Sequence, residues 1–427
     1  HVQQNENVDR GRLQVNVTST LGLQPVVNAR VGIAYTGESQ RVLEELQTDS
    51  SGQTEAVTLD APPVEYSQEP GRPQPFSEYT VTVQAEGYRS VEVSAIDVFA
   101  NVTALQEIRM EPLDISQKEG TENIVVPPNT LWGDFPPKIP EDEVKPVNES
   151  GEIVLSRVVI PEYVIVHDGP PTDTRAQDYY VRYRDYIKNV ASSEIYSTWP
   201  EATLRANILA IMSFSLNRVY TEWYRGKGYD FTITSSTAYD TRNGLLGARF
   251  SANISRIVDE IFNHYLSRPN VQQPILTQYC DGKNVTCSGW MTQWGSRYLG
   301  EQGYSPIEIL RYYYGSSIYI NSAEKIAGIP SSWPGTDLTV GSSGTKVRQI
   351  QQQLARISQA YPAIPTIAAD GIFGERTREA VEAFQRIFDL PVTGVVDFPT
   401  WYKISQIYVG VDEDCGVELT AIQVERT

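Results

Sequence analysis

Histidine, cysteine and long apolar runs are all scarce in this chain of 427 residues. Its 3 histidines are too few for a multi-histidine zinc site, and no H-E-x-x-H, G-x-S-x-G or phosphate-loop motif occurs. No stretch approaches the run of about 18 apolar residues that spans a bilayer. The sequence therefore argues against the common zinc, serine and nucleotide-dependent enzymes and against insertion into a membrane, and we expect no metal and no cofactor.

Basic clusters are missing as well. The 35 Lys and Arg residues are outnumbered by 53 Asp and Glu, which gives a formal net charge of −18. Nucleic acids and anionic membranes are bound through clustered Lys and Arg, so neither is expected as a partner. The chain has no export signal and begins at His1 rather than Met. We therefore expect a mature, exported protein whose signal segment has been removed.

Cysteine is limited to Cys280, Cys287 and Cys415, too few for a disulfide scaffold. The first two flank the segment CDGKNVTC, in which a hairpin would bring the two sulfur atoms within bonding range. Either a disulfide or two free thiols is compatible with this pattern. Cys415 is then left over, either buried or free to pair with another molecule.

Short alternating strands separated by turn residues fill residues 10–113, which predicts an all-β sandwich. The strand VNARV, the turn TDSSG at 48–52 and the segment YTVTVQAEGY at 79–88 resemble carboxypeptidase-regulatory-like modules of secreted bacterial proteins. This resemblance implies a spacer or adhesion unit.

Residues 114–157 are rich in Glu, Asp and Pro, and two proline pairs favour an extended, semi-rigid backbone. We interpret this segment as an acidic linker. Trp132 and Phe135 are expected to dock on a neighbouring domain of the same chain or, alternatively, on another subunit.

Residues 158–331 mix helical and strand patterns, which predicts an α+β domain. The clearest helix follows Thr198, which with Glu201 forms a capping-box pattern, and it ends near Gly226. A second helix is expected over 253–266, and a third after Ser305. One face of the first helix consists of Leu204, Ile208, Ile211, Ser215 and Val219.

Residues 336–410 form the last predicted domain, and residues 411–427 form a tail. The segments LTVGSSGTKVRQIQQQLARI and ADGIFGERTREAVEAFQRIFDLPVTGVVDFPTW are similar to the type-1 peptidoglycan-binding domain. This resemblance implies a three-helix fold and peptidoglycan as a partner. Two expected helix faces carry the core residues Val347, Ile350, Leu354, Ile357, Ala380, Val381, Phe384 and Phe388.

Two further motifs in the central domain resemble the stage II sporulation protein D/LytB amidase-enhancer domain. NVASSEIYSTWPEATLRANILAIMSFSLNRV resembles the opening segment of that domain, and MTQWGSRYLGEQGYSPIEILRYYYG resembles its closing segment. The resemblance implies that Glu194 is the acid/base of a murein lytic transglycosylase and that Trp199, Gln293 and Trp294 contact the glycan. Cleaving a glycosidic bond needs a protonated carboxyl group in an apolar setting. Alternatively, Glu194 is a polar residue that bonds to backbone amides at the start of a helix.

The chain departs from the family's pattern in two places. TCSGWMTQWG places Cys287 where the family has histidine, and the helix RANILAIMSFSL lacks the family's arginine and threonine. Some family members bind zinc through histidine and cysteine, so His264 with the two cysteines would make only an incomplete site.

Together these features predict a secreted, cell-wall-associated bacterial protein that binds peptidoglycan and processes glycan strands. The alternative is a non-catalytic extracellular subunit that self-assembles into a surface layer or filament, through its linker and termini, and uses the cell-wall-type domains as scaffolds. An acidic chain with 25 tyrosines is compatible with either function, because tyrosine serves both sugar stacking and protein interfaces.

Overall fold

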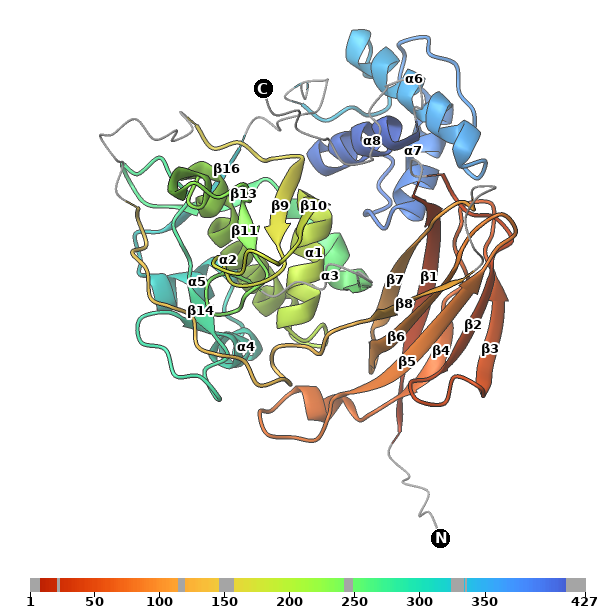
Figure 1. Cartoon of the computed structure of the whole chain (residues 1–427). Helices are drawn as coiled ribbons and strands as arrows, with labels where there is room; N and C mark the ends of the chain where they lie inside the picture. The colour runs from red at the N-terminus through yellow and green to blue at the C-terminus, as the bar shows by residue number, and fades with distance from the viewer. Residues whose placement is uncertain are drawn as a thin grey trace.

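The computed structural model describes residues 8–20, 24–113, 120–145, 157–241, 249–323, 334 and 336–411. It contains a β-rich N-terminal region, a central region of helices and short strands, and a helical C-terminal region (Figure 1). The predicted multidomain organisation is confirmed at this level. His1, Cys415 and most of the predicted tail lie outside the described residues. Among those residues, no helix has both the length and the apolar character needed to cross a membrane.

The N-terminal region consists of strands whose residues alternate between core and surface. In β1 (Asp9–Ser19), Leu13, Val15 and Val17 are fully buried, as the two-residue period of a strand requires. Two sheets, with strand orders β12-β7-β1-β4 and β3-β2-β5-β6-β8, enclose one apolar core. Their other elements are β2 (Arg30–Tyr35), β3 (Val42–Gln47), β4 (Val57–Ala61), the short helix η1 (Val64–Ser67), β5 (Phe76–Gln84), β6 (Ser90–Phe99), β7 (Thr103–Met110), β8 (Thr121–Val125) and β12 (Arg249–Ser251).

Two of these strands come from outside the stretch that predicts the β domain. Strand β8 lies in the segment interpreted as a linker and pairs in parallel with β6. Strand β12 comes from the central part of the chain and pairs antiparallel with β7, with Phe250 opposite Leu105. The central region is therefore joined to an N-terminal sheet by backbone hydrogen bonds.

The central region is built around α2 (Glu201–Tyr220), which contacts α1, α3, α4, α5 and β13. Its other elements are β9 (Tyr163–His167), β10 (Asp178–Arg182), α1 (Tyr183–Glu194), η2 (Arg225–Lys227), β11 (Ile233–Thr234), α3 (Ala252–Ile261), β13 (His264–Ser267), β14 (Tyr279–Cys280), β15 (Met291–Thr292), α4 (Gln293–Glu301), α5 (Pro306–Tyr314) and β16 (Tyr319–Ser322).

Helix α2 is buried on nearly all sides rather than on the single expected face. Its buried polar side chains have partners in neighbouring segments: Asn207 donates to Ser296 Oγ at 2.8 Å, Ser213 to the Ile275 carbonyl at 2.8 Å and Asn217 to the Pro274 carbonyl at 2.7 Å. Buried polar groups are tolerated when they are hydrogen-bonded in this way.

Two expectations about helix boundaries are wrong, and one is confirmed. Thr198 does not cap α2, because its hydroxyl donates instead to Ser67 Oγ in the N-terminal region at 2.7 Å. The helix expected over 253–266 ends at Ile261, and the chain then forms β13, which pairs with β16. The capping box of Ser305 and Glu308 is present at the start of α5.

The C-terminal region consists of α6 (Thr345–Ala360), α7 (Glu375–Ile387) and α8 (Phe398–Val411). The predicted core positions Val347, Ile350, Leu354 and Ile357 of α6 are all fully buried. Gly371, with φ of +82°, makes the turn before α7, and its amide donates to the Gln351 side chain at 2.7 Å.

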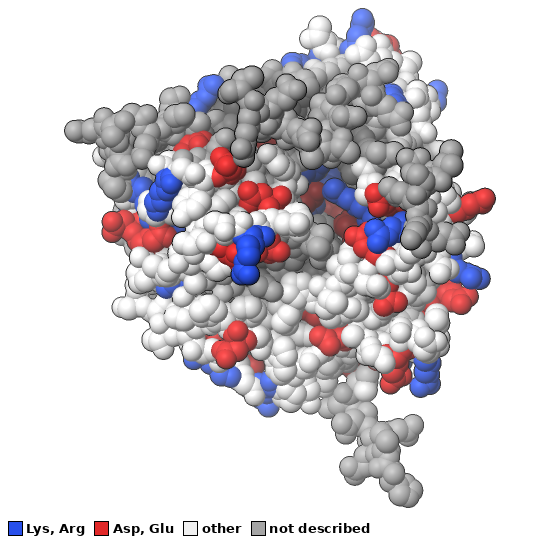
Figure 2. All heavy atoms as spheres, viewed as in Figure 1, with Lys and Arg blue, Asp and Glu red and all other residues white. Residues whose placement is uncertain are grey.

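The three regions meet at a junction of charged side chains, and the face drawn in Figure 2 shows charges of both signs in a hollow near it. Asp259 on α3 accepts hydrogen bonds from Lys188 at 2.6 Å and Arg184 at 3.3 Å, both on α1. Lys403 on α8 is also buried here. Burial lowers the pKa of Lys403 to about 8, and repulsion from Lys188 acts in the same direction while Asp259 opposes it.

This pKa predicts how Lys403 affects stability. Between about pH 8 and the ordinary lysine value of 10.5, the unfolded chain holds a proton that the folded chain has lost, so stability from this residue rises with pH. Denaturation measured from pH 7 to pH 10 should show the wild type gaining stability relative to Lys403→Met. The exposed Lys283, changed to Met, serves as the control and should show no such trend.

Candidate functional site

Glu194 is the last residue of α1, and only 2% of it is exposed. Residues from distant segments contact it. The Tyr279 hydroxyl on β14 donates to Glu194 Oε2, and Gln293, the first residue of α4, donates from Nε2 to the Glu194 carbonyl at 2.9 Å. Burial raises the pKa of Tyr279 well above its ordinary value, and the nearby Glu194 carboxylate adds to this, so Tyr279 acts as a neutral donor.

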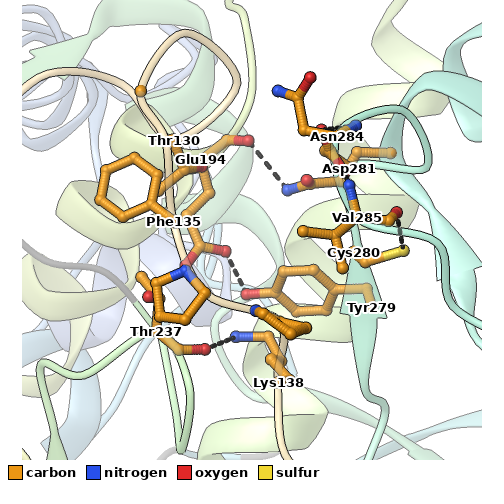
Figure 3. A pocket seen from close by; sticks show the side chains of 14 residues that line it. Thr130, Phe135, Lys138, Glu194, Thr237, Tyr279, Cys280, Asp281, Asn284 and Val285 are labelled. Atoms are coloured by element: carbon orange, nitrogen blue, oxygen red, sulfur yellow. Dashed lines mark hydrogen bonds between the residues drawn. The ribbon is translucent and has the colours of Figure 1, made fainter.

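A cavity of about 60 Å³ lies beside Glu194 (Figure 3). Tyr279, Cys280 and Gln293 line it from the central region. The rest of its wall includes residues of the acidic, proline-rich segment, among them Phe135 and Lys138. The segment interpreted as a linker therefore packs over the candidate site.

Lys138 brings a positive charge to this cavity. Its ammonium donates to the Asp240 carbonyl and lies 4.9 Å from the centre of the Tyr279 ring. Burial lowers the pKa of Lys138, while attraction to Glu194 and Asp240 opposes that change. The cavity therefore contains an acid, a phenol and an amine from three separate parts of the chain.

Of the three residues expected to contact a glycan, only Gln293 lines this cavity. Trp199 is 3% exposed, and its indole donates to the Ser67 carbonyl at 2.9 Å. Trp294 is half-buried and packs against Trp199, with ring centres 5.0 Å apart, and against Tyr196 at 5.8 Å. Trp199 is thus placed in the contact between the central and N-terminal regions, with almost no surface left for a sugar.

In the structure, Cys280 and Cys287 are joined by a disulfide. Asp281 organises the loop between them by accepting hydrogen bonds from the amides of Asn284 and Val285, both at 2.8 Å. His264 lies on β13. In the described part of the chain, no group of three or more His, Cys, Asp or Glu side chains is arranged to hold a metal ion.

Sequence reasoning did not identify Tyr279 or Lys138. Tyr279 directly precedes Cys280, and Lys138 directly follows the second proline pair, but neither position has a local pattern that indicates a site. Their contacts with the Glu194 site depend on chain segments that meet only in the folded protein.

Comparison with known proteins identifies one part of the chain. Residues 343–404 match the family described as a putative peptidoglycan binding domain. The zinc D-Ala-D-Ala carboxypeptidase of Streptomyces albus G is 40% identical over 97 residues, which span 22% of this chain and 35% of that enzyme. The match therefore covers only about a third of this relative's length.

Two solved structures show partial likeness. The SleB N-terminal domain is 28% identical with a TM-score of 0.16, covering 18% of this chain and 99% of that domain. The minor pilin GBS52 of Streptococcus agalactiae is 13% identical with a TM-score of 0.18, covering 27% of this chain and 49% of the pilin. The family match confirms a type-1 peptidoglycan-binding domain, whereas the resemblances of the central and N-terminal regions stay predictions.

The burial of Trp199 predicts a structural effect for its replacement. Trp199→Phe should lower the free energy of unfolding by about 1–3 kcal/mol, because the buried Ser67 carbonyl loses its donor. It should leave sedimentation of the protein with purified sacculi unchanged. Tyr312→Phe, at a position 66% exposed, is the control for stability. Loss of sacculus binding without loss of stability would contradict this role for Trp199.

Proposed function

We propose that this chain is a cell-wall protein that binds peptidoglycan through its C-terminal region and cleaves glycan strands at Glu194. Peptidoglycan binding is supported by the match of residues 343–404 to a peptidoglycan-binding family. The sequence identity of one part of the chain with a D-Ala-D-Ala carboxypeptidase supports a location at the cell wall. A disulfide between Cys280 and Cys287 is compatible with an oxidising compartment outside the cytoplasm, which favours secretion.

The proposed cleavage uses Glu194 as a general acid. Burial and the position at the C-terminal end of α1 favour the protonated form of Glu194, whereas the hydrogen bond from Tyr279 and the positive charge of Lys138 favour the carboxylate. The reaction requires the protonated form. Glu194 would donate its proton to the glycosidic oxygen as the bond to the anomeric carbon breaks. A hydroxyl of the same sugar would then attack that carbon and return a proton to Glu194, which leaves an anhydro-sugar end.

Gln293 and Tyr279 would support this reaction in different ways. Gln293 holds the backbone of Glu194 through the bond to its carbonyl, which fixes the end of α1. Tyr279 contacts the carboxyl group itself and would orient it toward the substrate. Neither residue needs to gain or lose a proton for the reaction to balance.

A second candidate function is favoured by one observation. The proline-rich segment covers the Glu194 cavity, as expected if the central region were a scaffold without catalysis. In that case the chain would be a wall-bound structural subunit. Self-assembly through the chain ends belongs to this second candidate, and residues 1–7 and 412–427 lie outside the described part.

The binding proposal makes a prediction about an exposed apolar pair. Ile372 is 61% exposed and Val340 is 44% exposed, and their segments are joined by the bond from the Gly341 amide to the Phe373 carbonyl at 3.0 Å. Ile372→Asp should weaken sedimentation with sacculi about tenfold, a loss of about 1.4 kcal/mol. Val392→Asp, at a position 49% exposed in the same region, is the matched control.

Two results would contradict different parts of this proposal. Failure of the wild-type protein to sediment with sacculi would overturn peptidoglycan binding itself. Normal binding by Ile372→Asp would leave that function standing and move the contact to another face of the C-terminal region.

The cleavage proposal is tested by product analysis. Wild-type protein incubated with sacculi should release anhydro-sugar fragments, and Glu194→Gln should release at least about a hundredfold less, because general acid catalysis contributes about 100- to 10,000-fold. Glu301→Gln, at an exposed glutamate of the same region, is the control. Wild-type protein that binds sacculi but releases no such fragments would support the scaffold function instead.

A further inference from the structure

We propose that residues 130–138, here called the strap, close the Glu194 site and must be displaced before a glycan strand can enter. This inference rests on the proposed function, because it treats the Glu194 cavity as the glycan site. Figure 1 shows the chain leaving β8 and running across the central region, and Figure 3 shows Phe135 and Lys138 beside Glu194.

The cavity beside Glu194 is small. About 60 Å³ remains beside Glu194 when the strap is in place. Sites that enclose an organic ligand usually have volumes of about 300–1,000 Å³. The strap contributes Thr130, Gly133, Phe135, Pro136, Pro137 and Lys138 to the cavity wall, so its departure would enlarge the site on that side.

The strap is anchored firmly where it begins. Asn129 is fully buried, and its side chain donates to the carbonyls of Ser192 and Ile195, both at 3.3 Å. The Thr130 amide donates to the Ser193 carbonyl at 2.8 Å. These bonds attach the start of the strap to the end of α1, immediately beside Glu194.

A second anchor follows the strap. Arg218 on α2 is fully buried and pairs with Glu141, with an N–O distance of 2.5 Å, and with Asp240 at 2.7 Å. Arg268 forms a further ion pair with Glu143. Breaking a buried ion pair costs about 3–5 kcal/mol, so this end should stay attached when the strap moves.

The stretch between the anchors is held differently. Pro136 and Pro137 have no amide hydrogen, so they cannot donate backbone hydrogen bonds to the central region. The amides of Trp132 and Gly133 both donate to the Asn129 carbonyl, within the same segment. Trp132 is 42% exposed. Lys138, at the end of the strap, is held by its hydrogen bond to the Asp240 carbonyl, and Trp132 contacts Phe76 of β5 edge-on, with ring centres 6.4 Å apart. Opening would break these contacts while the anchors on either side keep the segment attached.

The strap also changes the chemistry of Glu194. Lys138 attracts the Glu194 carboxylate, and this attraction favours the ionised form of the acid. An ionised glutamate cannot donate a proton to a leaving oxygen. The strap would thus fill the site, and its Lys138 would favour the charged form of the acid; opening would remove both effects.

The test measures access to position 194 by a thiol reagent, a readout independent of catalysis and of the peptidoglycan-binding domain. In a Glu194→Cys, Cys415→Ser chain without reductant, the introduced cysteine should react slowly with maleimide. Replacing residues 132–137 by a Gly/Ser segment of equal length should raise that rate about tenfold or more, as expected if the open form is a minor population. Asp134→Ala, an exposed strap residue outside the cavity wall, is the control.

If the strap-replaced chain has the wild-type melting temperature but an unchanged alkylation rate, the proposal that the strap closes the Glu194 site is overturned. If that chain does not fold, Lys138→Ala replaces it and should also raise the rate. Suppose that alkylation is faster but no form carrying Glu194 releases anhydro-sugar. This result would support closure of the site by the strap and refute the proposed cleavage. Faster alkylation with slower release than wild type would show that the strap is a wall for the substrate, which also overturns the proposal.

Discussion

The buried guanidinium of Arg218 is the constraint on which the central region depends. A fully buried positive charge is tolerated only when opposite charges and hydrogen bonds surround it. Burial works against the charge, but Asp240 and Glu141 outweigh it and hold the pKa of Arg218 above its ordinary value. Because Glu141 belongs to the proline-rich segment and Asp240 follows β11, this one charge fixes both segments against α2.

This constraint explains why a segment with the composition of a linker is not a spacer in its described part. Residues 129 and 141 are fixed to α1 and α2, so the chain between them has to cross the end of α1, where Glu194 lies. The position of the strap over the acid therefore follows from where its anchors are. The proposed cleavage and the closed state of the site both depend on this arrangement.

The parts of the fold that could be predicted are those controlled by local sequence. The capping box at Ser305 and the buried face of α6 both have short-range patterns, and both are present. Helix α1 was not predicted, because its buried face includes Arg184 and Lys188, whose partner Asp259 is on another helix. Thr198 failed as a cap for a similar reason, since its hydroxyl bonds to a residue 131 positions away.

The candidate site also combines residues that the sequence indicates with residues that only the packing of distant segments brings in. Glu194 was identified through a sequence resemblance, whereas Tyr279 reaches it from 85 residues away and Lys138 arrives from a segment with no site pattern. Trp199 has the right residue type for stacking on a sugar, but its burial against Ser67 depends on how two regions pack. Patterns in a sequence identify residue types that suit a function, and packing between regions decides which of them remain accessible.

The most direct measurement of this account is hydrogen–deuterium exchange of the full-length protein with and without soluble glycan strands. We expect glycan strands to increase exchange in residues 130–138 and to decrease it at the end of α1 around Glu194. No change in either segment, in a chain that binds the strands through its C-terminal region, would contradict it.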